Sequence, residues 1–179
     1  GVIVPEESVL AGDITTNTIL TADTVWELSG LVVVKDGAVL TIEPGTKIVG
    51  QSGTGVNTSY MIIDKGSRII ADGTAANPIV FTSKIAHDGG AEAPGQWGGL
   101  TIIGNAADVG VPPSDEQVEP YEVNTLFVPG STDAADDSGV LRYVEILNSG
   151  ITMEQDKEIN GLSLVGVGSG TIIEHVTVK

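Results

Sequence analysis

The chain has 179 residues, enough for one domain with a substantial apolar core, and its 8 Lys and Arg stand against 24 Asp and Glu for a net charge of −16. A charge of this sign and size repels phosphate backbones and anionic lipid headgroups, which excludes nucleic acid as an expected partner. The chain has no cysteine for disulfides or thiolate metal sites, and its apolar runs are shorter than the roughly 18 to 20 residues that span a bilayer, so we expect no transmembrane segment.

Residues 1–24 stand apart from the rest of the chain. They begin apolar, pass through Pro5-Glu6-Glu7 and continue in the Thr-rich run ITTNTILTADT (14–24). Because the end of a stack of β-strands offers unpaired backbone edges to other chains, we interpret residues 1–24 as an N-terminal cap.

Residues 25–107 carry a repeat that is typical of stacked β-coils. In LVVVKDGAVLTIEPGTKIVG (31–50), short β-branched runs alternate with turn residues. The pattern returns in IIDKGSRIIADGT (62–74), where Gly66 follows Gly37 by 29 residues. A fixed period in this range predicts a solenoid.

Two further strand-like segments, PIVFT (78–82) and GQWGGLTIIGNA (95–106), complete this part of the chain. The pair Gly98-Gly99 beside Trp97 predicts a corner where the backbone passes close to a bulky ring.

Residues 108–139 interrupt the repeat. This segment has no period and is rich in Pro and acidic residues, so we interpret it as an acidic loop insertion on the coil wall, where solenoids often bind their partners. Coils resume over residues 140–179 in VLRYVEIL (140–147), GLSLVGV (161–167) and TIIEHVTV (171–178). No capping segment follows the last strand, so we expect an open C-terminal end at which either the native protein continues or another molecule pairs.

These elements predict an all-β fold: a single right-handed parallel β-helix of roughly five coils that spans residues 1–179. Its core is expected to consist of ladders of Val, Leu and Ile, namely Val33, Leu40, Ile42, Ile48, Ile62, Ile69, Val80, Leu100, Ile102, Val144, Ile146, Leu162, Leu164, Ile172 and Val176.

Five stretches that cover most of residues 31–179 carry a family resemblance: GAVLTIEPGTKIVG, GSRIIADGTAANPIVFTS, GQWGGLTIIGNA, DDSGVLRYVEI and EINGLSLVGVGSGTIIEHVTV. They are similar to the right-handed parallel β-helix repeat proteins, including β-helix lipoproteins, that bacteria secrete or display on their surface. The resemblance implies the fold, an extracellular or cell-surface location, and an N-terminal portion of a longer protein. It implies no activity that could be assigned to particular residues, and the lipidated Cys of many such proteins has no counterpart in this sequence.

The acidic segment is the main candidate for metal binding. The stretch from Ile85 to Leu141 has ten acidic residues and no Lys or Arg. Within STDAADDSG (131–139), Asp133, Asp136 and Asp137 could supply oxygen ligands to calcium, which takes six to eight of them. A solvated acidic loop is the alternative.

An enzyme of the polysaccharide lyase or hydrolase type is a second alternative, because β-helices often host such activities. Hydrolysis needs two carboxylates roughly 5 to 10 Å apart, for which Asp136 and Asp137 are candidates. A lyase would typically combine calcium with an Arg or Lys base, and Arg142 is equally well interpreted as an ion-pair partner on the outer wall. We assign no catalytic residue, since fold analogy alone is weak support for catalysis.

The histidines and aromatic residues offer weaker signals. His175 lies in a strand and His87 in a loop, where a transition-metal site with Asp88 is the less favoured alternative to simple solvent exposure. In the insertion, Tyr121 and Phe127 are candidates to stack on sugar rings, although packing is the commoner role of such residues.

The leading hypothesis is therefore a non-catalytic, extracellular or cell-surface structural or adhesive module that uses calcium and self-associates through its ends. The alternative is a polysaccharide-binding or polysaccharide-degrading β-helix protein.

Overall fold

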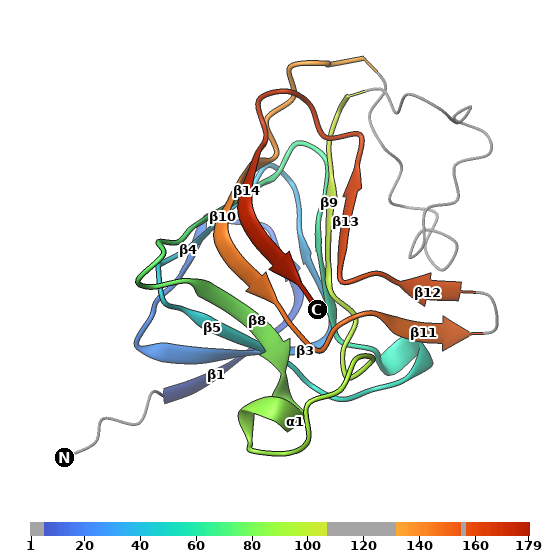
Figure 1. Cartoon of the computed structure of the whole chain (residues 1–179). Coiled ribbons are helices and arrows are strands. Elements are labelled where there is room, and N and C mark those ends of the chain that lie inside the picture. The colour runs from blue at the N-terminus through green and yellow to red at the C-terminus, as the bar shows by residue number, and fades with distance from the viewer. Residues whose placement is uncertain (1–5, 107–131, 155–156) are drawn as a thin grey trace.

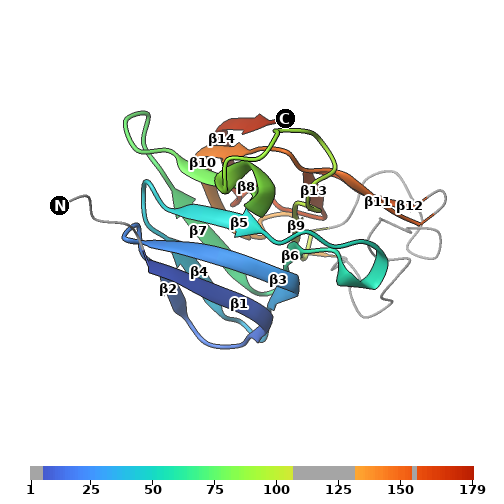
Figure 2. The ribbon, with the colours of Figure 1, turned by 90° about the horizontal axis from the view of Figure 1, so that it is seen from below.

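A computed structural model describes residues 6–106, 132–154 and 157–179. Over these residues the chain forms a right-handed parallel β-helix with three faces, and twelve strands join in one continuous sheet (Figure 1). The coils stack from β1 (Glu6–Ile14) at one end to β14 (Ile172–Val178) at the other (Figure 2). The predicted fold is confirmed.

Each face is a column of parallel strands from successive coils. Face A contains the first halves of β1 and β3 (Thr24–Val34), then β5 (Lys47–Gly50), β8 (Ile79–Ser83) and the last parts of β10 (Gly139–Ile146) and β14. Face B contains the second halves of β1 and β3, then β6 (Tyr60–Ile63), β9 (Leu100–Ile103) and β13 (Leu162–Val165). Face C contains β2 (Thr18–Leu20), β4 (Val39–Ile42), β7 (Arg68–Asp72) and the first parts of β10 and β14. The described chain thus makes five full turns and begins a sixth.

Inward side chains align from coil to coil as apolar ladders, because parallel strands in register place equivalent residues above one another. Each member of the following ladders is at most 2% exposed: Leu20, Ile42, Ala71 and Leu141 on face C; Ile48, Phe81 and Ile146 on face A; Val34, Ile63 and Ile102 on face B. These ladders form one continuous core along the helix axis.

Several predicted core positions need correction. Val80 points outward, because Phe81 stacks on Ile48 and thereby fixes Ile79 and Phe81 as the inward residues of β8. Val33 and Ile62 are buried, but in a second cluster that lies apart from the central core. The predicted core residues of the last coil are only partly buried or exposed: Leu162, Leu164, Ile172 and Val176.

The predicted N-terminal cap is not a separate element. β1 and β2 pair in parallel with β3 and β4, so residues 6–20 form the first coil. The repeat was hidden in the sequence because Ser8, Gly12 and Thr18 occupy positions where the next coil carries larger apolar side chains.

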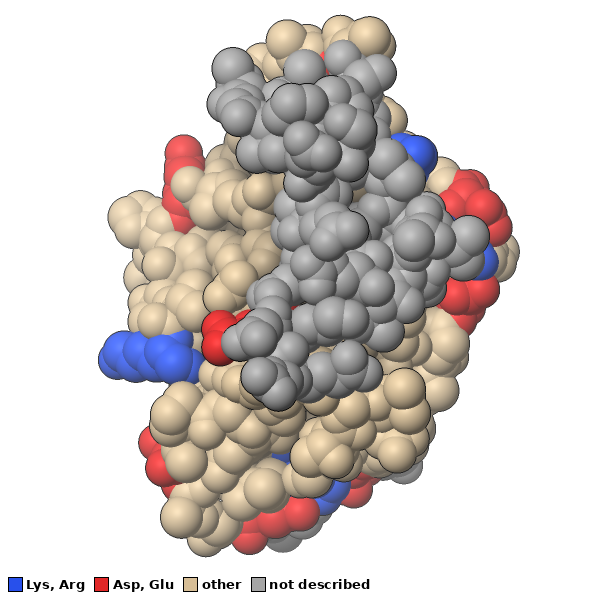
Figure 3. Space-filling view, turned by 90° about the vertical axis from the view of Figure 1, so that its right-hand side faces the viewer, with Lys and Arg blue, Asp and Glu red and all other residues tan. Residues whose placement is uncertain are grey.

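A short hairpin covers part of the outer side of face B. It consists of β11 (Ile151–Glu154) and β12 (Lys157–Ile159), which pair antiparallel. Its residues Ile151, Met153 and Ile159 belong to the cluster that contains Val33 and Ile62. The described surface on this side is largely uncharged, with acidic and basic side chains toward its rim (Figure 3). This second apolar layer has no counterpart among the elements predicted from the sequence.

A second excursion follows β8 and ends in a buried tryptophan. α1 (Lys84–His87) begins where the Ser83 hydroxyl accepts a hydrogen bond from the Ala86 amide. Trp97 is 1% exposed, stacks on Phe81 at 6.3 Å between ring centroids and donates through Nε1 to the Leu147 carbonyl. The close approach of backbone to Trp97 was predicted at Gly98 and Gly99, but these glycines lie against Tyr60 and the backbone of Gly161. The residue that lies against Trp97 is Gly50, where a Cβ would lie 2.7 Å from the Trp97 Cβ.

The acidic insertion leaves and rejoins the coil at one point. The Asn105 carbonyl accepts hydrogen bonds from the amides of Thr132 (3.2 Å) and Asp133 (2.9 Å). Only residues 132–139 of the predicted insertion are described, and they lead directly into β10. Among the described residues, no helix has the length and hydropathy needed to cross a membrane.

Candidate functional site

The three aspartates predicted to bind calcium each have a partner within the protein. Asp136 is 8% exposed, and its carboxylate accepts hydrogen bonds from Asn105 Nδ2 (3.1 Å) and Ser138 Oγ (2.8 Å). Asp137 forms an ion pair with Arg68 at 2.6 Å, while exposed Asp133 accepts from the Ala135 amide. These bonds brace the base of the insertion against the coils.

The geometry does not gather these aspartates into one ligand set. They do not form a group of three whose ligand atoms lie within 4.8 Å of one another, although such a group exists elsewhere in the described chain. The predicted ligand-binding residues Tyr121 and Phe127 lie outside the described residues.

Arg142 is an ion-pair partner on the outer wall. Its Nε lies 2.9 Å from Glu174 and its Nη1 lies 2.7 Å from Asp72, and the three residues occupy aligned positions on successive coils of face C. The hydrogen bonds to Glu174 and then Asp72 raise the pKa of Arg142, so its guanidinium stays protonated. A permanently protonated group is a poor general base.

A shallow cleft lies beside this charged row, at the corner between faces C and A. It has a volume of about 350 Å³ and is lined in part by Tyr143, Glu145 and His175. The Tyr143 and His175 rings stack at 4.4 Å between centroids, with an angle of 6° between their planes. Both residues have left-handed backbone conformations, with φ of 48° and 52°, which turn β10 and β14 around the corner. The place of His175 in a strand predicts a position in the wall of the coil, but the structure places it exposed at a corner.

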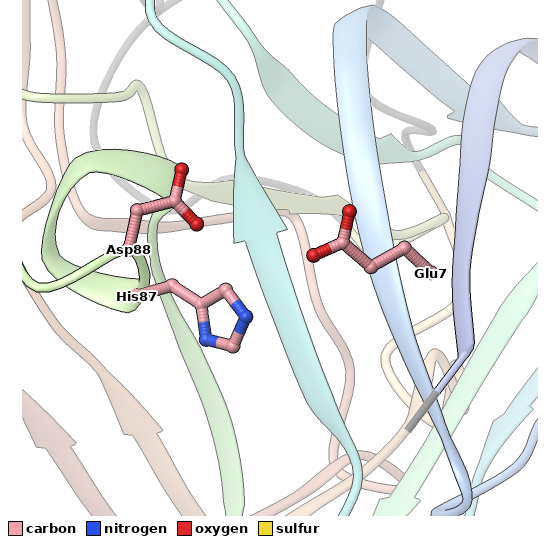
Figure 4. A group of neighbouring side chains, drawn as sticks. All are labelled: Glu7, His87 and Asp88. Carbon is pink, nitrogen blue, oxygen red and sulfur yellow. The ribbon is translucent and has the colours of Figure 1, made fainter. Parts of the chain in front are cut away.

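The group of potential metal ligands consists of Glu7, His87 and Asp88. A carboxylate oxygen of each acid and an imidazole nitrogen all lie within 4.8 Å of one another. Glu7 comes from β1, whereas His87 ends α1 and Asp88 follows it, and the three side chains face one another (Figure 4). Glu7 and Asp88 are exposed and His87 is half-buried.

Lys84 ties this group to the wall of the β-helix. Its ammonium lies 2.7 Å from both carboxylate oxygens of Asp88, 3.7 Å from Glu27 and 3.8 Å from Glu7. The hydrogen bond to Asp88 is the main reason that the pKa of Lys84 is raised. Next to the group, a cleft of about 310 Å³ is lined in part by Glu7, Lys47 and His87.

The sequence suggested His87 and Asp88 as a possible metal site, but it gave no indication that Glu7 belongs to the same group. The signal for the pair was the adjacency of an imidazole and a carboxylate in a loop. Glu7 lies 80 positions earlier in a segment that was interpreted as a cap, and no local pattern connects it to His87. Only the stacking of the coils brings them together.

One comparison with known proteins gives a match. A family model described as a pectate-lyase-like β-helix domain matches residues 12–179. No curated protein and no solved structure matches the chain. The matched span begins within β1 and contains every later strand, so it covers the stack of coils rather than one motif. The chain therefore belongs to the family of pectate-lyase-like β-helix domains.

Proposed function

We propose that this domain is a non-catalytic structural or adhesive module of an extracellular or cell-surface protein, and that a second copy of the chain binds the C-terminal end of its β-helix. One observation carries this proposal. Leu164, Ile173 and Val178 extend the buried ladders of faces B, C and A, yet they are 40%, 36% and 47% exposed. Burying such side chains gains roughly 25 cal/mol per Å² of apolar surface, which favours association at this end.

The backbone of β14 supports the same proposal. Among the described strands, β14 pairs only with β10, so its other edge offers unpaired amides and carbonyls. An exposed edge next to apolar side chains is a template for another strand. Association of a second copy would satisfy both the edge and the apolar ends of the ladders, as would further coils of a longer chain.

The partners of the charged residues favour a role without catalysis. The arginine that could act as a lyase base, Arg142, is held between two carboxylates, and Arg68 is paired with Asp137. Of the two carboxylates considered for hydrolysis, Asp136 is buried and accepts hydrogen bonds from Asn105 and Ser138, and Asp137 is the partner of Arg68. These side chains stabilise the wall of the β-helix in their present positions.

A polysaccharide-binding or polysaccharide-degrading role is the alternative, and the family description fits it equally well. The cleft with the stacked rings of Tyr143 and His175 favours it, because aromatic faces pack against sugar rings. Turnover or binding across a panel of acidic and neutral glycans would support this alternative. Replacing Tyr143 with Ala should then weaken glycan binding.

Sedimentation velocity of the chain over a wide concentration range tests self-association. The wild-type protein should form larger species as its concentration rises, whereas Leu164→Lys and Val178→Lys should stay monomeric, because each puts a charge into the apolar end. Both residues are exposed in the single chain, so the substitutions should leave its circular dichroism spectrum unchanged.

Val56→Lys is the matched control, since Val56 is 85% exposed and lies in the 3₁₀ turn η1 (Gly55–Asn57), away from β14. It should associate like the wild-type chain. A wild-type protein that remains monomeric at all concentrations would argue against association through this end. Repeating the series with calcium and with a chelator tests whether Asp133, Asp136 and Asp137 make association calcium-dependent.

A further inference from the structure

We propose that Glu7, His87 and Asp88 bind a first-row transition-metal ion of the Zn²⁺ type, and that the ion links the first coil of the β-helix to α1. The site does not use β14, and its ligand Glu7 lies on β1, which is at the opposite end of the stack from β14 (Figure 2). It would act as a removable cross-link on the N-terminal coil.

The donor set determines the class of ion. An imidazole nitrogen and two carboxylate oxygens are ligands that Zn²⁺ accepts at about 2.0 to 2.2 Å, and three protein ligands leave a fourth position for water. The imidazole disfavours calcium and magnesium, which prefer oxygen ligands only. The donor atoms lie within 4.8 Å of one another, so small side-chain rotations bring all three onto one ion. Glu7 and Asp88 are exposed, so neighbouring side chains do not block these rotations once Lys84 releases Asp88.

The surrounding charge is suited to a cation. Three carboxylates, those of Glu7, Glu27 and Asp88, surround the single ammonium of Lys84. Lys47 adds a second positive charge on the neighbouring cleft. The remaining excess of negative charge attracts a divalent ion, and the cleft gives that ion a path from solvent to Glu7 and His87.

Lys84 is the competitor of the metal. Its ammonium donates to both oxygens of Asp88, so the ion must displace it from that carboxylate. Glu27 is 7% exposed and lies 3.7 Å from the ammonium, which gives Lys84 another acceptor after displacement. Removing this lysine should therefore strengthen metal binding rather than weaken it.

The chain positions of the ligands determine what the ion would do. β1 pairs only with β3 among the described strands, and its outer edge is open. α1 follows β8, so a metal bound to Glu7 and His87 would connect coil one to coil four across the intervening strands of face A. Such a cross-link should protect the amides of β1 from exchange.

Isothermal titration calorimetry of the metal-free chain with Zn²⁺ tests the proposal. We expect one ion per chain, with affinity at least about tenfold weaker in His87→Ala and Glu7→Gln, because losing a ligand costs no less than losing one of its supporting residues. His175→Ala is the matched control, since it removes the other histidine of the chain and should bind like the wild type. Lys84→Met should bind more tightly than the wild type.

The unfolding temperature and hydrogen exchange distinguish binding at this site from nonspecific binding of Zn²⁺ to exposed carboxylates. At a hundredfold excess over the dissociation constant, Zn²⁺ should raise the unfolding temperature by about 5 °C or more and slow hydrogen exchange in β1, with neither effect in His87→Ala. Excess Ca²⁺ should not compete. Equal Zn²⁺ affinity in the wild type and His87→Ala, or unchanged affinity in Lys84→Met, would overturn the assignment.

Discussion

Glycines with positive φ are needed in this chain for two different reasons, the backbone conformation and the absence of a side chain. The atoms around each glycine determine which reason applies. Gly37, at φ +79°, turns between β3 and β4 with no other atom within 4 Å of the position of a Cβ. Gly139, at φ +117°, begins β10 where a Cβ would collide with the backbone of Ile69. The first glycine is needed for its backbone conformation alone, and the second also for its small volume.

This difference makes a prediction for alanine substitutions. Gly37→Ala should lower the free energy of unfolding by about 1 to 2 kcal/mol, the cost of a left-handed conformation in a residue with a side chain. Gly139→Ala should cost roughly 3 kcal/mol or more, since β7 cannot move away without breaking its pairing with β4. Urea denaturation of both variants measures the two costs. Equal costs would show that crowding at Gly139 is relieved by movement of the backbone.

Asp136 and Asp133 provide a second matched pair. Asp136→Ala leaves Asn105 Nδ2 and Ser138 Oγ without their acceptor in a buried place and should cost about 1 to 3 kcal/mol. Asp133→Ala should cost less than about 1 kcal/mol, because its carboxylate is exposed. Thermal unfolding with and without a calcium chelator measures both. A loss in Asp136→Ala that vanishes in chelator would assign the role of Asp136 to calcium rather than to these hydrogen bonds.

The strands of the coils could be predicted from the sequence, whereas the elements that connect them could not. Regular coils were predictable, because β-branched runs and turn glycines recur at the coil period, as with Gly37 and Gly66. α1 and the β11–β12 hairpin were not predictable. Each is short, and each is held by contacts to residues far away in the sequence, such as Lys84 of α1 with Glu27 of β3 and Met153 of the hairpin with the cluster that contains Val33 and Ile62.

The segment 107–131, which contains most of the acidic insertion, should be removable as a unit. Thr132 and Asp133 both bond to the Asn105 carbonyl, so replacing residues 107–131 with two glycines spans a short gap. Shortening this loop lowers the entropy of the unfolded chain, and the free energy of unfolding should stay equal or rise by about 1 to 2 kcal/mol. Differential scanning calorimetry measures the change.

Replacing the hairpin, residues 151–159, with two glycines is the contrasting deletion. It removes Ile159, which is 1% exposed, and uncovers Tyr60 and Ile62, so the unfolding temperature should fall. If removing residues 107–131 lowered stability as much as removing the hairpin, the insertion would contribute contacts to the coils and the view of it as a separate unit would be wrong.

At the scale of the whole molecule, the sequence predicted the architecture but not the candidate sites. Composition and period were enough for a parallel β-helix of about five coils, since that fold depends on repeated local patterns. The first coil escaped prediction, because its inward Ser8, Gly12 and Thr18 do not look like a core. Glu7 and His87 come from coils one and four, and they meet only because α1 folds back toward β1 across the two coils between, a relation that no local pattern encodes.

The corner at Tyr143 lets one strand, β10, pair with β7 on face C and with β8 on face A. Because the strands run around the axis, their hydrogen bonds point along it. We expect tension on the two ends of the chain to act first on β1 and β14, since each pairs with one neighbour among the described strands. Coils should therefore unfold one after another from an end. A chain built in this way absorbs mechanical work over a long extension instead of failing in one step.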